Sequence, residues 1–349
     1  MLEALVRVVL TGSVADDLLA EVAVEPEVSL PGVEVGSDAT VPRATIAQAL
    51  ALVLFADLCE RVPSAAGYVA DQRAAGRRLV LDHAAVRTVA APCGALPAGQ
   101  EQVARLLRAL GYEHRETYDL AALRMTGRSW AHVDHPEAVP QWFVSELHLD
   151  RLSPEVQVAA ERLLATSLDP LTAADHELLD RLAADGSLPL ADAAVLVPAL
   201  ARCFARLHAE PTDRDHDLFA QESAELAWIA TEGTTGNHWT DRVPDVAAAA
   251  EAERLAGRPI KDTIEVSGSR RVRQTAHRAT LVERRFHTVE GRSLVRTVPG
   301  SFFELIERAP RPDGSGLDLA FDAANATGIF AMTRAEGPSG ILGGRRAGA

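Results

Sequence analysis

The sequence predicts an α+β protein in which two related modules form a half-open barrel, with helical segments added around them. Each module has the order strand, helix and then several strands. Two observations predict this class. Strand-like alternation begins near Arg78 and returns after Gly236, and each time a helical pattern and further strand patterns follow. The stretches before and between the modules show the three- and four-residue apolar spacing of helices.

The N-terminal segment, residues 1–75, is expected to be mainly helical. Apolar residues between Ile46 and Leu58 recur at three- and four-residue steps, which gives a helix one apolar stripe. The stretch 24–41 is rich in Pro, Gly and Val. It predicts a loop or short strands rather than a helix.

The first module is expected over residues 76–150. Alternation from Leu79 to Arg87 predicts a strand with two distinct faces. A helix follows at 100–110, and Gly111 is a suitable end for it. Further short strands are expected at 112–119, 123–126, 130–134 and 142–147.

Residues 151–232 are expected to form a helical insertion, in which Ser153-Pro154 and Thr172 mark helix starts. The second module then spans 233–335 and repeats the order of the first, with a helix at 245–255. Its later strands are expected at 264–267, 272–279, 281–288 and 301–308. Residues 336–349 lack periodicity and are expected to form a flexible tail.

Composition excludes several classes of function. The net charge of -14 and the pI near 5.3 argue against a nucleic-acid partner, which requires a basic surface. The best apolar stretch, residues 49–58, is too short to cross a membrane. The three cysteines form no Cys-x-x-Cys pair, and the N-terminus has no basic region of a signal peptide. We therefore expect a cytoplasmic enzyme; the pattern predicts no oligomeric state.

Three strand patterns, far apart in the chain, each carry one side chain that can bind a metal: His83, His238 and Glu304. The two histidine segments share a spacing, namely an acid or amide, the histidine, three residues and an arginine. Two histidines and one carboxylate are the ligands of the facial triad, which leaves positions open on Fe(II) for substrate and dioxygen. Taken alone, Glu304 is equally compatible with an ion pair to a buried arginine, and a hydrogen-bonded core position is the better explanation for either histidine. The matching neighbours and spacing of the two histidine segments favour the metal site for the three together.

Arginines follow both histidines at the same distance. On a strand, His83, Ala85 and Arg87 share one face, so Arg87 is placed to bind a substrate carboxylate several carbons away from the metal. A pairing with a local acid is the alternative. Arg242 has the equivalent position after His238, and the same two alternatives apply to it.

A second cluster, His132-Val133-Asp134-His135, offers a competing metal site of the metallohydrolase kind. No further histidine cluster accompanies it, and Pro136 ends the strand. We therefore expect a solvated turn here.

The ligand segments resemble the 2-oxoadipate dioxygenase/decarboxylase family. The resemblance lies in Asp82–Thr88, Gly236–Thr240 and Phe302–Arg308, which occur in the family's order, with support from Trp142–Leu147 and Val272–Ala276. The family has the vicinal oxygen chelate fold and is related to 4-hydroxyphenylpyruvate dioxygenase and hydroxymandelate synthase. The resemblance therefore implies this fold for the two strand–helix–strand modules.

The same resemblance implies a site and a reaction. It implies Fe(II) held by His83, His238 and Glu304, with Arg87 binding a substrate carboxylate. Gln274 is a further candidate for orienting the substrate or a ligand through hydrogen bonds. With dioxygen, 2-oxoadipate would yield 2-hydroxyglutarate and carbon dioxide.

Two alternatives remain within the same fold. One is a glyoxalase-like isomerase or lyase that uses its metal as a Lewis acid. The other is a module that sequesters a ligand without catalysis. The chain also has shorter helical segments than the best-known family members, which leaves room for a different 2-oxo acid.

Overall fold

The computed structural model describes residues 1–31, 39–322, 328 and 331–333, and the tail expected at 336–349 lies outside this part of the chain. The helices are α1 (Leu2–Val9), α2 (Ser13–Glu21), α3 (Pro26–Ser29), α4 (Arg43–Arg61), α5 (Pro63–Ala74), α6 (Glu101–Ala109), α7 (Pro154–Leu164), α8 (Ala173–Asp185), α9 (Leu190–Ala201), α10 (Asp213–Glu222), α11 (Ala224–Glu232) and α12 (Val246–Leu255). The strands are β1 (Thr40–Pro42), β2 (Leu81–Val89), β3 (Tyr112–Leu120), β4 (Met125–His132), β5 (Gln141–Leu147), β6 (Ser187–Pro189), β7 (His238–Arg242), β8 (Glu265–Val266), β9 (Val272–Ala276), β10 (Leu281–His287), β11 (Ser293–Pro299) and β12 (Phe302–Arg308).

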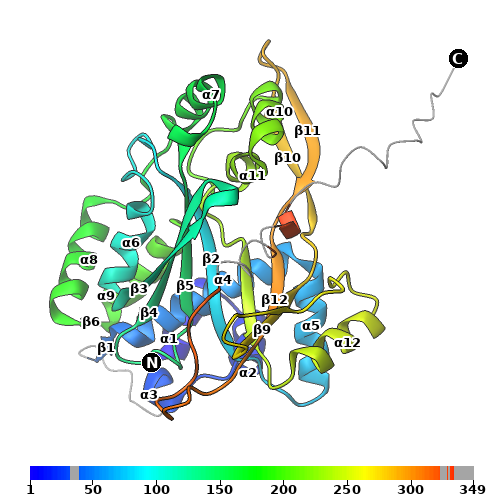
Figure 1. Cartoon of the computed structure of the whole chain (residues 1–349). Helices are drawn as coiled ribbons and strands as arrows, with labels where there is room; N and C mark the ends of the chain where they lie inside the picture. Colours follow the sequence, from blue (N-terminus) through cyan, green and yellow to red (C-terminus); the bar gives the residue numbers. More distant parts are fainter. Residues whose placement is uncertain (32–38, 323–327, 329–330, 334–349) are drawn as a thin grey trace, which may run out of the picture.

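An eight-stranded sheet with the order β3-β4-β5-β2-β7-β12-β9-β8 forms the centre of the molecule (Figure 1). Its two halves have the same arrangement. In each half the last strand lies parallel to the first, and two antiparallel strands continue to the edge. The first strands of the halves, β2 and β7, pair antiparallel in the middle. The sheet curls into a half-barrel, so the predicted vicinal oxygen chelate fold with its added helices is confirmed.

Some local predictions were wrong. One continuous strand, β4, replaces the two short strands expected around Gly127. Gly127 does not interrupt it, because this glycine only makes room for the ring of Phe143, which a β-carbon would approach to 2.4 Å. The hairpin β10–β11 is inserted between β9 and β12 and pairs only with itself among the described strands, and β11 was not expected. The stretch 24–41 holds the short helix α3 and strand β1, with residues 32–38 outside the described part.

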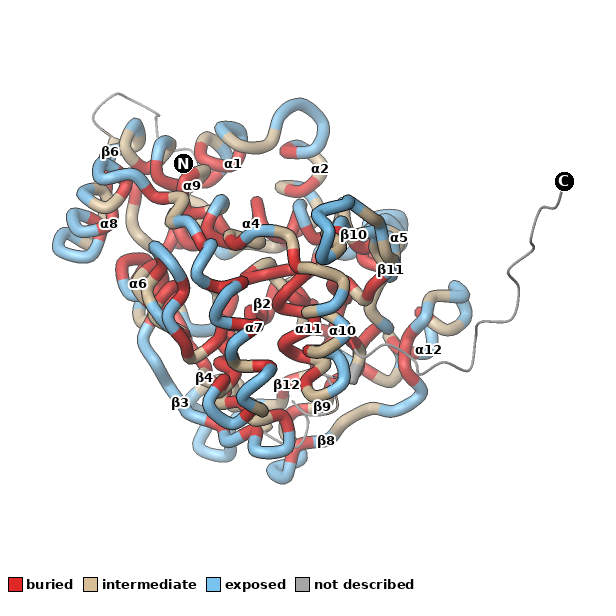
Figure 2. Tube along the Cα trace, turned by 90° about the horizontal axis from the view of Figure 1, so that it is seen from above, coloured by how far each residue is buried: buried red, intermediate tan, exposed pale blue. Residues whose placement is uncertain are grey.

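The main apolar core lies between one face of the sheet and the N-terminal helices, of which α4 is buried along most of its length (Figure 2). Trp239 and Phe303 point to this face and contact the ring of Phe55 on α4, with centroids 6.2 and 6.3 Å apart. Asp241 also points there and accepts a 2.6 Å hydrogen bond from the hydroxyl of Tyr68 on α5.

Because side chains alternate along a strand, the residues between these core positions point to the opposite face, where α7, α10 and α11 gather at one end with the hairpin β10–β11 (Figure 1). No helix within the described ranges is long and apolar enough to span a membrane.

Candidate metal centre

The three expected ligands lie on three neighbouring strands, β2, β7 and β12. Thr240 on the middle strand pairs with His83 on one side and with Glu304 on the other. His238 lies two residues before Thr240 on the same face. Neighbouring strands are about 4.8 Å apart, so side chains from all three strands reach one point above the small threonine.

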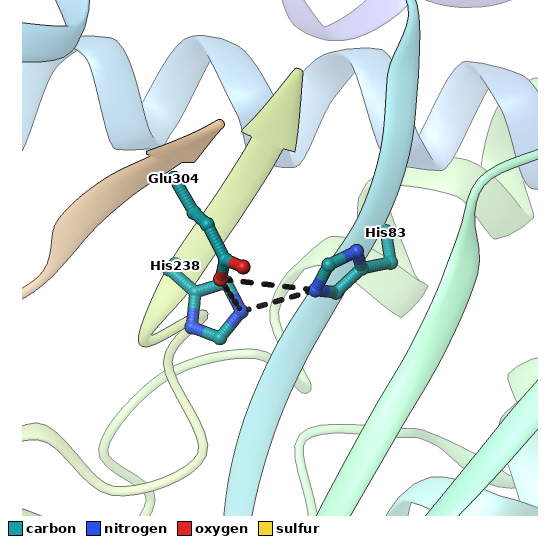
Figure 3. A group of neighbouring side chains, drawn as sticks. All are labelled: His83, His238 and Glu304. Atoms are coloured by element: carbon teal, nitrogen blue, oxygen red, sulfur yellow. Dashed lines mark hydrogen bonds and ion pairs between the residues drawn. The ribbon is translucent and has the colours of Figure 1, made fainter. Parts of the chain in front are cut away.

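The donor atoms of the three side chains converge (Figure 3). Nε2 of His238 lies 3.1 Å from Oε2 of Glu304, and Nε2 of His83 lies 3.4 Å from Nε2 of His238 and 3.9 Å from the same carboxylate oxygen. Neighbouring ligands of a six-coordinate metal, with bonds of about 2.1 Å, lie about 3 Å apart. Two of the three separations are close to this value and the third is longer, so the three atoms lie near enough to share one metal ion.

A β-bulge adjoins the first ligand. The register of β2 against β7 shifts between Leu81 and His83. Strict alternation would place Leu81 on the same face as His83. Because of the bulge, Leu81 instead packs in the core between the sheet and the N-terminal helices. Next to the bulge, a carboxylate oxygen of Asp82 lies 2.8 Å from Nδ1 of His83. A carboxylate at this nitrogen fixes the tautomer in which Nε2 is free to bind a metal.

Asp82 is itself held by Arg308, at the end of β12. The guanidinium donates to both carboxylate oxygens, over 2.8 to 3.1 Å, and both side chains are almost completely buried. Arg308 also donates to the carbonyl oxygens of Asp318 and Ala320. One buried arginine thus connects the first ligand to the segment after β12.

The second ligand has an amide as its outer partner. The side-chain amide of Asn237 lies 2.9 Å from Nδ1 of His238. When His238 binds a metal through Nε2, its Nδ1 carries a proton and donates a hydrogen bond. Asn237 can accept this hydrogen bond only if its amide oxygen, and not its amide nitrogen, faces the ring. That oxygen, Oδ1 of Asn237, has no hydrogen-bond partner among the described residues in its present orientation.

Burial determines the protonation of the three ligands. It lowers the pKa of His238 well below its ordinary value, with contributions from His83 and Arg87, and it lowers the pKa of His83 despite the nearby Asp82. It also raises the pKa of Glu304. Both histidines are therefore neutral near pH 7 and present lone pairs.

The residues fit a divalent metal ion. Neither carboxylate oxygen of Glu304 has a hydrogen-bond donor among the described residues, although the side chain is 1% exposed. A buried carboxylate without donors is unfavourable unless it binds a cation or takes up a proton. Two neutral imidazoles and one carboxylate are the donor set that suits Fe(II) in oxygenases.

A pocket opens beside these three side chains. Its other lining residues are Ala85, Arg87, Phe143, Asn237, Gln274, Phe321 and Asp322. The structure thus brings two of the three expected substrate-binding residues, Arg87 and Gln274, to the metal ligands. The ring of Phe321 packs at 4.8 Å from that of His83 and forms an apolar wall.

The third expected substrate-binding residue, Arg242, does not reach this pocket, and its guanidinium donates to the carbonyl oxygen of Glu137. Arg87 and Arg242 each lie four residues after a histidine. Because β2 and β7 are antiparallel, the two arginines lie at opposite ends of the site. Equivalent positions in the two modules therefore have different surroundings.

The competing cluster is not a solvated turn throughout. His132 is fully buried, and its Nδ1 accepts hydrogen bonds from the backbone nitrogens of Asp134 and His135. Asp134 forms an ion pair with Arg43. The cluster lies at the end of β4. Its side chains are not among those that could hold a metal ion together in the described part of the chain.

Comparisons with known proteins identify the family and the fold. The family model for 2-oxoadipate dioxygenase/decarboxylase matches residues 45–317. A protein from Ralstonia eutropha JMP134, described as a member of the glyoxalase superfamily, is 44% identical over 92% of this chain and 98% of its own, with a TM-score of 0.86. Hydroxyglutarate synthases in complex with 2-oxoadipate share the fold. The one from Oryza sativa is 19% identical over 82% of this chain and 91% of its own (TM-score 0.65), and the one from Pseudomonas putida is 21% identical over 85% and 74% (TM-score 0.62). No curated protein matches the chain in sequence.

The fold and the donor set define a metal-dependent enzyme of the vicinal oxygen chelate type. The family match extends over most of the chain and includes all three ligands. The chain belongs to the 2-oxoadipate dioxygenase/decarboxylase family, which confirms the resemblance seen in the sequence and makes it an enzyme of the oxygenase/decarboxylase class.

Proposed function

We propose that this protein binds Fe(II) through His83, His238 and Glu304 and uses dioxygen to decarboxylate and hydroxylate a 2-oxo acid. The observation that carries the proposal is the buried three-donor face, which is open toward the pocket on its other side. Bound iron would supply the chelation of the 2-oxo acid and the activation of dioxygen. The family description supports 2-oxoadipate as substrate, which would give 2-hydroxyglutarate and carbon dioxide.

The remaining pocket residues would orient the substrate and exclude water. Arg87 lies four residues beyond His83 on the same face of β2, where its guanidinium can bind the far carboxylate of a dicarboxylic acid. Gln274 lies on β9, next to the strand of Glu304, and its amide offers both a donor and an acceptor. Phe143 and Phe321 supply apolar surface around the carbon chain.

We also propose a cytoplasmic location. Cys59, Cys93 and Cys203 are all free, as expected of a chain kept in a reducing compartment.

The direct test is oxygen uptake by protein reconstituted anaerobically with Fe(II). A panel of 2-oxo acids, with 2-oxoadipate among them, should give substrate-dependent uptake and release one carbon dioxide per dioxygen consumed. Uptake should disappear in His83→Ala and Glu304→Ala, whereas Asp134→Asn, at an exposed position outside the pocket, should retain it. Turnover that persists in either ligand variant would overturn the proposed site.

The glyoxalase-like isomerase or lyase is the second candidate, because the 44% identical protein is described as a glyoxalase superfamily member. Such an enzyme would use its metal as a Lewis acid and consume no dioxygen. Anaerobic turnover of a thiol adduct, without oxygen uptake on any 2-oxo acid, would favour this candidate. The donor set argues against it, since the group contains only one carboxylate.

A further inference from the structure

Helix α11, in the region expected as a helical insertion, contacts the pocket through Arg87. Nη1 of Arg87 lies 2.7 Å from a carboxylate oxygen of Glu225, in the first turn of α11. The guanidinium carbon lies 4.5 Å from the ring centroid of Trp228, one turn further along. Residues three apart on a helix share a face, so the same side of α11 offers Arg87 a charge and an aromatic plane.

The pair is buried away from water. The side chain of Arg87 has no solvent exposure and that of Glu225 is 3% exposed. A guanidinium in such surroundings needs a partner of opposite charge, because the loss of hydration is otherwise uncompensated. The first turn of a helix also favours the negative charge of Glu225.

Helix α11 is anchored independently of Arg87. The indole nitrogen of Trp228 donates a 3.0 Å hydrogen bond to the carbonyl oxygen of Gly300, just before the strand of Glu304. Ser223 caps the start of the helix, and Glu232 near its end forms two 2.7 Å hydrogen bonds with Arg284 of β10. The position of α11 relative to the metal ligands is thus fixed on several sides.

We propose that Glu225, together with Trp228, is a positioning residue that orients Arg87 toward the far carboxylate of a dicarboxylic 2-oxo acid. The inference rests on the proposed function and adds to it: the helical insertion contributes to the selectivity for the far end of the substrate by holding Arg87 of the first module. Glu225 does not contact the substrate itself. It holds Nη1 of the guanidinium, while Nη2 donates a 2.9 Å hydrogen bond to Oγ1 of Thr333 and the same group forms part of the pocket wall.

The test is Glu225→Gln in the full-length, Fe(II)-reconstituted enzyme, assayed by oxygen uptake with 2-oxoadipate and 2-oxohexanoate. These substrates have the same chain length and differ only in the far carboxylate. We expect the KM for 2-oxoadipate to rise about tenfold or more, because a misoriented arginine loses a bidentate contact. The KM for 2-oxohexanoate and both kcat values should stay within about twofold of wild type.

Glu232→Gln is the matched control, since Glu232 is a buried, arginine-paired glutamate on the same helix outside the pocket. The contact of Glu225 with Arg87 remains in this variant, so it should leave the ratio of the two KM values unchanged. If Glu225→Gln does not fold, Trp228→Phe gives the second test. It keeps a ring but loses the bond to Gly300, and should again raise only the KM for the dicarboxylate.

Three outcomes would overturn the inference. An equal rise in KM for both substrates would show a general structural role, and a fall in the KM for 2-oxoadipate would show that Glu225 competes with the substrate for Arg87. Unchanged KM values would show no role. Each of these leaves the proposed function intact as long as the wild type consumes dioxygen with a 2-oxo acid. Absence of uptake by the wild type on every 2-oxo acid would refute the proposed function, and the inference with it.

Discussion

Replacement of Asp82 by Asn tests whether the outer partner of His83 tunes the metal centre. The substitution keeps the shape of the side chain and an oxygen that accepts from Nδ1 of His83, but it removes the charge. Arginine and histidine together hold the pKa of Asp82 far below its ordinary range, although burial alone would raise it. The carboxylate is therefore ionised near neutral pH, where the substitution removes a charge.

The structure allows two magnitudes to be worked out. Removing one partner of a buried ion pair costs about 3–5 kcal/mol of folding free energy. Arg308 keeps its two carbonyl acceptors, at 2.8 and 2.9 Å, so we expect the lower end, about 3 kcal/mol. Loss of an outer partner weakens metal binding by about 10–100-fold, and we expect about tenfold because the hydrogen bond to His83 persists.

The assays are urea unfolding of the metal-free protein and anaerobic Co(II) or Fe(II) affinity by competition with a chelating dye. Asp241→Asn is the matched control, because Asp241 is equally buried on the neighbouring strand but points to the helical face and bonds to Tyr68. It should leave the metal affinity unchanged. Wild-type metal affinity in Asp82→Asn, with lowered stability, would show that Asp82 serves only the ion pair and would refute the reasoning.

Three further predictions concern the ligands, the second arginine and pH. Saturating metal at about 100 times Kd should stabilise the wild type by about 2.7 kcal/mol in equilibrium unfolding, and this gain should vanish in Glu304→Ala, which lacks one donor. In oxygen-uptake assays, Arg242→Ala should leave the KM for 2-oxoadipate within about twofold of wild type, because Arg242 bonds to Glu137 outside the pocket, whereas Arg87→Ala should raise it by at least about tenfold. Burial raises the pKa of Asp241 to about 6, so the folded state binds this proton more tightly than the unfolded state and stability falls as pH rises from about 4 through 6. Relative to Asp241→Asn, the wild type should lose about 2 kcal/mol of unfolding free energy between pH 4 and pH 7, and a difference that is constant across this range would contradict the assignment.

Strand alternation and internal repetition predicted the parts of the site that depend on period alone. The shared face of His83 and Arg87, the inward direction of Glu304 and the duplicated order of elements all follow from a two-residue period and a repeated spacing. A β-bulge cannot be recognised from the spacing of residues in the sequence. Strict alternation therefore predicted that Asp82 points away from His83, whereas the bulge brings the two side chains together. Glu225 lies in a helix whose docking depends on contacts distant in sequence, and no local pattern indicates its pairing with Arg87.

The duplication also explains why the proposed centre has three candidate ligands and not four. His83 and His238 occupy equivalent positions in the two modules. Ala85 and Thr240 lie two residues further along, and each pairs with a residue on the last strand of its own module. In the second module this pairing reaches Glu304, whereas in the first it reaches Phe143, which is buried and packs at 5.1 Å from Phe321. The symmetric fourth ligand position therefore holds an apolar ring. A Lewis-acid isomerase with a symmetric set of ligands needs a carboxylate there, whereas an oxygenase needs that side of the metal open for substrate and dioxygen.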